Sequence, residues 1–150
     1  MVKHVLYAED EESDAFFLKL CFQEIGIQEP FQLVTDGEQA IHYLSGQGPY
    51  ADRHRYPIPC LILLDLNLPR KSGFEILKWR REHPVAKLIP VVILTSSHNP
   101  EDVRQAYDLG AAGYLTKLPN PADWGKRACA IRDFWLEQNV PPPPCVEGTQ

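Results

Sequence analysis

The sequence predicts an α/β fold, a doubly wound sheet of five parallel strands in a three-layer sandwich. Five short apolar runs recur along the chain, and each is followed by a segment with helix signals. Such strict alternation implies parallel strands joined by right-handed crossovers. The 150 residues, 44% of them hydrophobic, can bury the core of one ordinary domain but leave no room for a second full domain.

The apolar runs are the expected strands. Short runs of this composition are typical of strands that are buried on both faces of a sheet. The third run, CLILL, is the most uniformly apolar and should therefore lie at the centre of the sheet. The expected strands lie at residues 5–8, 31–34, 60–64, 91–95 and 112–116.

The intervening segments carry helix start and stop signals. We expect the first helix to begin after Ser13 or Asp14 and to end at Gly26. The segments at 36–46 and 73–84 suit two short crossover helices, the later one stopped by its final proline.

Two further helices share one N-terminal pattern, an asparagine followed by a proline. Asn99 should cap a helix that Gly110 ends, and Asn120 should open a helix that continues to residue 138.

Composition excludes several classes of protein. The 15 basic against 20 acidic residues give a net charge of -5, which disfavours nucleic acid as a partner. No apolar run approaches the ~20 residues of a membrane span, and acidic residues by position 9 exclude a signal peptide. We therefore expect a soluble, cytoplasmic protein without a membrane partner.

The four cysteines show neither CxxC spacing nor a paired histidine. Cys21, Cys60, Cys129 and Cys145 are therefore expected to be buried or free thiols, not zinc ligands or disulfides. Free thiols suit a reducing cytosol.

Polar residues follow four of the expected strands. Glu9 and Asp10 end the first strand, Asp65 the third, Thr95 the fourth and Lys117 the fifth. Ligands of doubly wound sheets bind at the carboxyl ends of the strands, so these side chains should meet at one site.

The residue types at this edge indicate phosphoryl chemistry. Three crowded carboxylates would raise one another's pKa unless a cation shared the site, and Mg²⁺ prefers such oxygen ligands. The backbone carbonyl of Asn67 could complete the ligand set. Lys117 and Thr95 can both donate to phosphoryl oxygens, and Asp65 could then act as a nucleophile that carries an aspartyl-phosphate.

These motifs together resemble a known family over residues 1 to 137. The Glu9-Asp10 pair, LLDLNLPRKSG around Asp65, the LTSS segment and GYLTK occur in register with the response regulator receiver domains of two-component signalling. The resemblance implies the flavodoxin-like receiver fold. One departure is that the usual Lys-Pro pair is replaced by Lys117-Leu118-Pro119.

The resemblance also implies a role for each site residue. Asp65 would accept a phosphoryl group from the phosphohistidine of a sensor histidine kinase, so that the protein would catalyse only its own phosphorylation and dephosphorylation. Asp10 and Asp65 would hold Mg²⁺ with the Asn67 carbonyl, and Glu9 would act through water. The phosphoryl-contact and switch residues would be Thr95, Ser96, Lys117, Asn67 and Tyr114.

Two segments point to a subgroup. The insert at 45–59 and the RDFWL ending resemble single-domain receivers that include the partners of bacterial and cyanobacterial phytochromes. We expect a receiver domain at 1–138 and a proline-rich tail at 139–150, with no output domain. A downstream protein target would then read the receiver surface directly.

Alternative functions stay open. A receiver-like scaffold could bind partners without phosphorylation. An aspartyl-phosphate phosphatase would need an acid two positions after its nucleophile, where Asn67 stands. A nucleotide-binding domain would need a glycine-rich turn after the first strand, where the chain instead has carboxylates.

The last helix carries more large apolar residues than one buried stripe needs. We expect a symmetric homodimer through the fourth helix, fifth strand and fifth helix. The alternative is that the VPPPP tail folds back over these side chains. The apolar residues are Trp124, Ile131, Phe134, Trp135 and Leu136.

Overall fold

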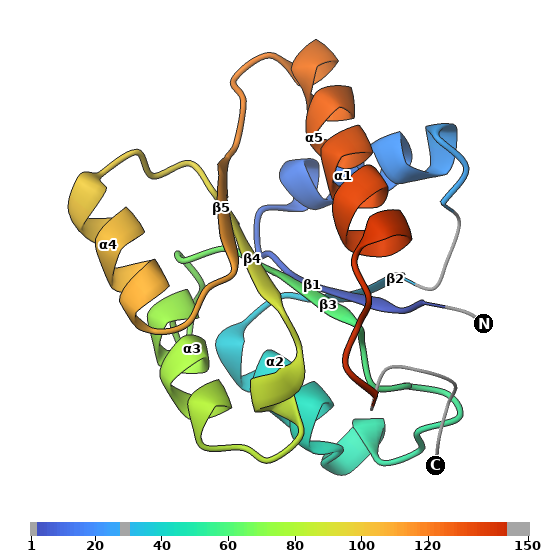
Figure 1. Cartoon of the computed structure of the whole chain (residues 1–150), viewed down its shortest axis with the longest axis vertical. Coiled ribbons are helices and arrows are strands. Elements are labelled where there is room, and N and C mark those ends of the chain that lie inside the picture. Colours follow the sequence, from blue (N-terminus) through green and yellow to red (C-terminus); the bar gives the residue numbers. More distant parts are fainter. Residues whose placement is uncertain (1–2, 28–30, 144–150) are drawn as a thin grey trace.

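Five parallel strands form one sheet in the order β2-β1-β3-β4-β5 (Figure 1). The computed structural model describes residues 3–27 and 31–143. The strands are β1 (Val5–Ala8), β2 (Phe31–Val34), β3 (Leu61–Leu64), β4 (Val91–Thr95) and β5 (Gly113–Thr116). The helices are α1 (Glu12–Glu24), α2 (Gly37–Ser45), α3 (Gly73–Arg81), α4 (Pro100–Asp108) and α5 (Trp124–Ala130), the last continued by a π-helix, Ile131–Gln138.

Helices cover both faces of the sheet. Helix α1 packs against α5, and α3 lies beside α2 and α4 (Figure 1). The predicted three-layer sandwich is confirmed. Among the described residues, no helix is long and apolar enough to cross a membrane.

Strand β3 occupies the predicted central position, between β1 and β4. All four of its residues are fully buried. Ala8 and Leu64 are register partners, and the Asp65 amide donates to the Ala8 carbonyl at 3.1 Å. This register places the residues that follow β1 and β3 side by side.

The first and fifth helices begin at residues other than those predicted. Helix α1 starts at Glu12, so Asp14 lies inside its first turn; the predicted start was wrong because the Asp14 side chain bonds Lys117 and caps nothing. At the fifth helix, Asn120 accepts from the amide of Ala122 and forms a 3₁₀ turn, so the α-helix itself starts only at Trp124.

The boundaries of α4 are those predicted. The Asn99 side chain accepts from the Glu101 amide at 3.0 Å, and Gly110 follows the helix with a φ of 105°. Because L-residues with a side chain rarely adopt this φ, glycine suits the position.

The insert after α2 is folded against that helix. Tyr43 of α2 packs with Tyr50 and Tyr56 of the insert, with ring centroids 5.0–6.1 Å apart. Arg53 donates to the carbonyls of Leu44 and Tyr56, both at 3.0 Å, and so caps the helix end. The insert is therefore an ordered loop with one 3₁₀ turn.

The cysteines that the structure describes are free thiols. Cys60 is buried, and Cys21 and Cys129 are half-buried. Cys145 lies outside the described residues.

Candidate functional site

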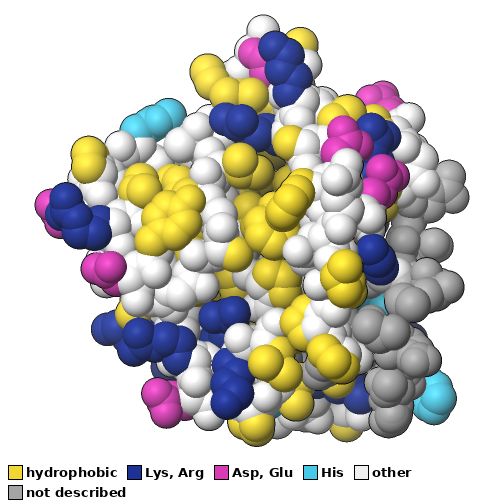
Figure 2. All heavy atoms as spheres, viewed as in Figure 1, with side chains coloured by type: hydrophobic (Ala, Val, Ile, Leu, Met, Phe, Trp, Pro, Cys, Tyr) yellow, Lys and Arg dark blue, Asp and Glu magenta, His cyan; other side chains and the backbone are white. Residues whose placement is uncertain are grey.

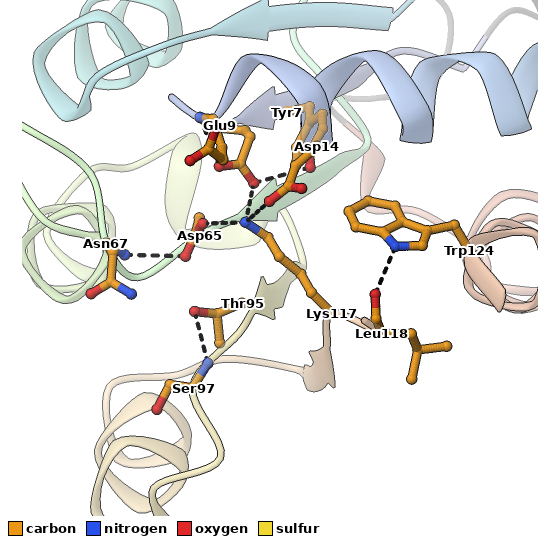
Figure 3. Close-up of polar contacts among 11 residues, drawn as sticks. Tyr7, Glu9, Asp14, Asp65, Asn67, Thr95, Ser97, Lys117, Leu118 and Trp124 are labelled. Carbon is orange, nitrogen blue, oxygen red and sulfur yellow. Dashed lines mark hydrogen bonds and ion pairs between the residues drawn. The ribbon is translucent and has the colours of Figure 1, made fainter. Parts of the chain in front are cut away.

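The site is built around one lysine. The Lys117 Nζ atom lies 2.7 Å from Glu9 Oε1, 2.7 Å from Asp65 Oδ2 and 2.8 Å from Asp14 Oδ2 (Figure 3). The lysine side chain is only 9% exposed, and those of Glu9 and Asp65 are 0% and 6% exposed. Three carboxylates thus share a single buried ammonium group.

The sheet positions this cluster. Glu9 directly follows β1, Asp65 follows β3 and Lys117 follows β5. The Lys117 amide donates to the carbonyl of Thr95 at 2.7 Å, which fixes the end of β5 against the end of β4. Because all the strands are parallel, residues at their carboxyl ends meet at one edge of the sheet.

Additional hydrogen bonds orient the two buried carboxylates. Glu9 accepts from the Tyr7 hydroxyl and from the Glu11 amide, both at 3.1 Å. Asp65 Oδ1 accepts from the Asn67 amide at 3.1 Å, while its other oxygen bonds Lys117. A carboxylate held at both oxygens keeps a fixed orientation at the edge of the sheet.

The electrostatics of the site show an excess of negative charge. Burial and the neighbouring Asp65 charge raise the pKa of Glu9 to about 7, although Lys117 acts in the opposite direction. Burial alone would lower the pKa of Lys117, but hydrogen bonds to the three carboxylates raise it above its ordinary value. Burial and Glu9 likewise raise the pKa of Tyr7. One ammonium group therefore does not neutralise the cluster.

A second group of contacts links the site to α4. Thr95 is completely buried, and its hydroxyl oxygen lies 3.5 Å from the Ser97 amide. The Tyr114 hydroxyl donates to the Ser97 carbonyl at 3.1 Å, and Ser97 Oγ donates to Asp102 of α4 at 2.6 Å. The loop after β4 therefore connects a buried site residue to a surface helix.

Not every predicted residue joins the cluster. Asp10, Asn67 and Ser96 are exposed, and Asn67 reaches Asp65 only through its backbone amide. Two residues that we did not predict do join it: Asp14 bonds Lys117 and Tyr7 bonds Glu9. Asp14 lies close in sequence to the end of the first strand, and the first turn of a helix that begins there returns to the same edge of the sheet. This spacing could have identified Asp14 as a site residue.

The donor set at this edge fits Mg²⁺. In the part of the chain that the structure describes, no three His, Cys, Asp or Glu side chains are arranged around a common metal position. Mg²⁺ does not require three, since it keeps several waters and binds through one or two carboxylates. Asp65 and Asp10 would supply hard oxygen ligands, with the Asn67 carbonyl as a third. The raised pKa of Glu9 shows that negative charge is in excess here, which a divalent cation would offset.

Comparison with known proteins identifies the family. Residues 5–127 match the response regulator receiver domain. The chain belongs to this family. It is 41% identical over 135 residues to the response regulator Rcp1 of Synechocystis sp., an alignment that covers 90% of each protein.

Solved structures of similar sequence have the same fold. The phosphorylated cyanobacterial phytochrome response regulator RcpA matches with a TM-score of 0.88 at 34% identity, over 95% of this chain and 99% of that one. The Mn²⁺-bound form of Rcp1 matches with a TM-score of 0.82 at 39% identity, over 94% of this chain and 99% of that one. The predicted likeness to phytochrome-partner receivers is confirmed.

Proposed function

We propose that this receiver accepts a phosphoryl group on Asp65 from the phosphohistidine of a sensor histidine kinase, with Mg²⁺ at the adjacent carboxylates. The observation that carries the proposal is the buried Asp65 carboxylate at the end of the central strand, 2.7 Å from the Lys117 ammonium. Asp65 would attack phosphorus while the P–N bond to the histidine ring breaks, which forms an aspartyl-phosphate and releases the histidine. Lys117 would bind the charge on the phosphoryl oxygens.

The remaining site residues have roles consistent with this reaction. Asp65 and Asp10, with the Asn67 carbonyl, would hold the metal ion, which supplies charge neutralisation when bound. Ser96 and Thr95 would donate their hydroxyl groups to phosphoryl oxygens. Chelation of the metal should stop labelling, because the carboxylates would lose their neutralising cation.

The switch would pass through the loop after β4. A phosphoryl group on Asp65 attracts the Thr95 hydroxyl, and the loop that contains Ser97 moves with it. Since Tyr114 and α4 both bond Ser97, the movement changes the surface that a downstream protein would read.

The relatives support a choice of partner kinase. RcpA is a phytochrome response regulator, and another similar structure is a regulator in red light signalling of R. palustris, 32% identical with a TM-score of 0.87. We propose a phytochrome-type kinase for this chain, acting in the cytoplasm. The extent of the domain at 1–138 stays a prediction, because part of the tail lies outside the described residues.

Homodimerisation through α4, β5 and α5 also remains part of the proposal. Trp124 and Ile131 are buried in the core, but Phe134 is 53% exposed and Tyr107 of α4 is 49% exposed. Figure 2 shows hydrophobic side chains gathered over β5 and the adjoining side of α4. A second subunit would cover this surface.

The decisive experiment is phosphoryl labelling measured by intact mass. Purified protein is incubated with Mg²⁺ and either acetyl phosphate or the phosphorylated kinase. We expect one added phosphoryl group on the wild type and on Asp108→Asn, which alters an exposed carboxylate of α4, and none on Asp65→Asn. Full labelling of Asp65→Asn would contradict the acceptor assignment, and an unlabelled wild type would favour a scaffold.

A further inference from the structure

A cavity of about 440 Å³ opens beside the candidate site. It lies between α1, the loop after β4 and the loop after β5. Its lining residues are Asp14, Phe17, Ser96, His98, Lys117, Leu118, Pro119 and Trp124. The cavity therefore extends from the lysine that contacts Asp65 to the tryptophan at the start of α5.

The far wall of the cavity is aromatic and fixed. The rings of Phe17 and Trp124 lie 6.5 Å apart, tilted by 48°. The Trp124 indole N–H donates to the Leu118 carbonyl at 2.8 Å, which ties this wall to the loop that follows Lys117. Figure 3 shows Asp65 and Trp124 on opposite sides of the Lys117 side chain. A planar ring in the cavity would find apolar faces to pack against.

Among the residues that line this cavity, only Asp14 carries a carboxylate. Its side chain is 24% exposed, and its Oδ2 atom bonds Lys117. Its Oδ1 atom has no hydrogen bond to the described part of the chain, so it can accept one from a bound molecule. Lys117 can only donate, and Ser96 and His98 are exposed at the rim.

We propose that this cavity receives the leaving group of the phosphoryl donor, a planar nitrogen heterocycle of the imidazole type, and that Asp14 accepts a hydrogen bond from its N–H. The inference rests on the proposed phosphorylation of Asp65.

The chemistry of the transfer gives Asp14 a defined role. The bond between Asp65 and phosphorus forms while the P–N bond to the ring breaks, and the electron pair of the P–N bond stays on that nitrogen. When the other ring nitrogen carries a proton, the ring leaves as neutral imidazole. A carboxylate that accepts a hydrogen bond from this N–H stabilises the protonated, better-leaving ring. An anionic leaving group such as acetate would gain nothing from Asp14.

Two small donors separate these cases. Phosphoimidazole leaves as imidazole and acetyl phosphate leaves as acetate, so the ratio of their labelling rate constants measures the contribution of the leaving group. We expect Asp14→Asn to lower this ratio about tenfold, in line with the loss of one charge-assisted hydrogen bond. Any effect of Asp14 through Lys117, or on folding, changes both rate constants alike and cancels in the ratio.

Glu12→Gln is the matched control. Glu12 is an exposed carboxylate in the same helical turn as Asp14, but it lines a different cavity. Its ratio should equal that of the wild type. The assignment of Asp14 would be overturned if the ratio were unchanged in Asp14→Asn, or if His98→Ala lowered it instead. In both cases, labelling of the wild type would still uphold the proposed function. No labelling from either donor would overturn both proposals.

Discussion

Replacing Lys117 with methionine should destabilise the fold, because it leaves two buried carboxylates without their cation. Each Nζ to oxygen distance of 2.7 Å corresponds to an attraction of about 6 kcal/mol at an effective dielectric constant of about 20. Desolvation of the ammonium group and repulsion among the carboxylates offset much of this attraction. Removal of one partner from a buried ion pair costs about 3–5 kcal/mol, which is the loss in unfolding free energy that we expect for Lys117→Met.

The loss should depend on pH with a definite sign. The folded-state pKa of Glu9 is raised from 4.5 to about 7, so the folded protein binds a proton that the unfolded chain does not bind between these values. Without Lys117 this pKa should rise further, and protonation of Glu9 at low pH should relieve part of the cost. The destabilisation should therefore be larger at about pH 8.5 than at about pH 5.5.

Urea unfolding in the presence of a chelator measures this effect, because no divalent cation can then replace the lysine. Lys126→Met is the matched control: its side chain is 81% exposed and its Nζ lies 3.9 Å from Asp123, a surface pair whose loss should cost about 0–1 kcal/mol. The double change Lys117→Met with Asp65→Asn should recover part of the stability. Equal losses for the two methionine variants would refute the reasoning.

Two predictions concern signalling. Thr95→Ala should still accept a phosphoryl group, but the conformational change should not reach α4. Amide chemical shifts of residues 101–108 that change on phosphorylation as much as in the wild type would contradict this coupling. The double change Phe134→Glu/Trp135→Glu should convert a dimer to a monomer in light scattering at tens of micromolar. Phe16→Glu, which alters a 63% exposed side chain on α1, should leave the dimer intact, and a monomeric wild type with and without a phosphoryl mimic would reject the dimer.

Local sequence pattern determined the sheet and the position of Asp65, the proposed acceptor. Each strand is a short apolar run, and β1, β3 and β4 are buried along their whole length, as is typical of such runs in a parallel sheet with helices on both faces. Because parallel strands align their carboxyl ends, the position of Asp65, Thr95 and Lys117 at strand ends was enough to place them at one edge.

Tertiary packing alone decided which groups contact each other there. Asp14 and Lys117 are 103 residues apart in the chain, and their contact depends on how α1 and β5 meet the same edge of the sheet. The hydrophobic periodicity of the sequence carries no information on such a contact, so the sequence left Asp14 as a candidate helix start. Packing places Asp14 against the lysine, since the first turn of α1 begins directly beyond the end of β1.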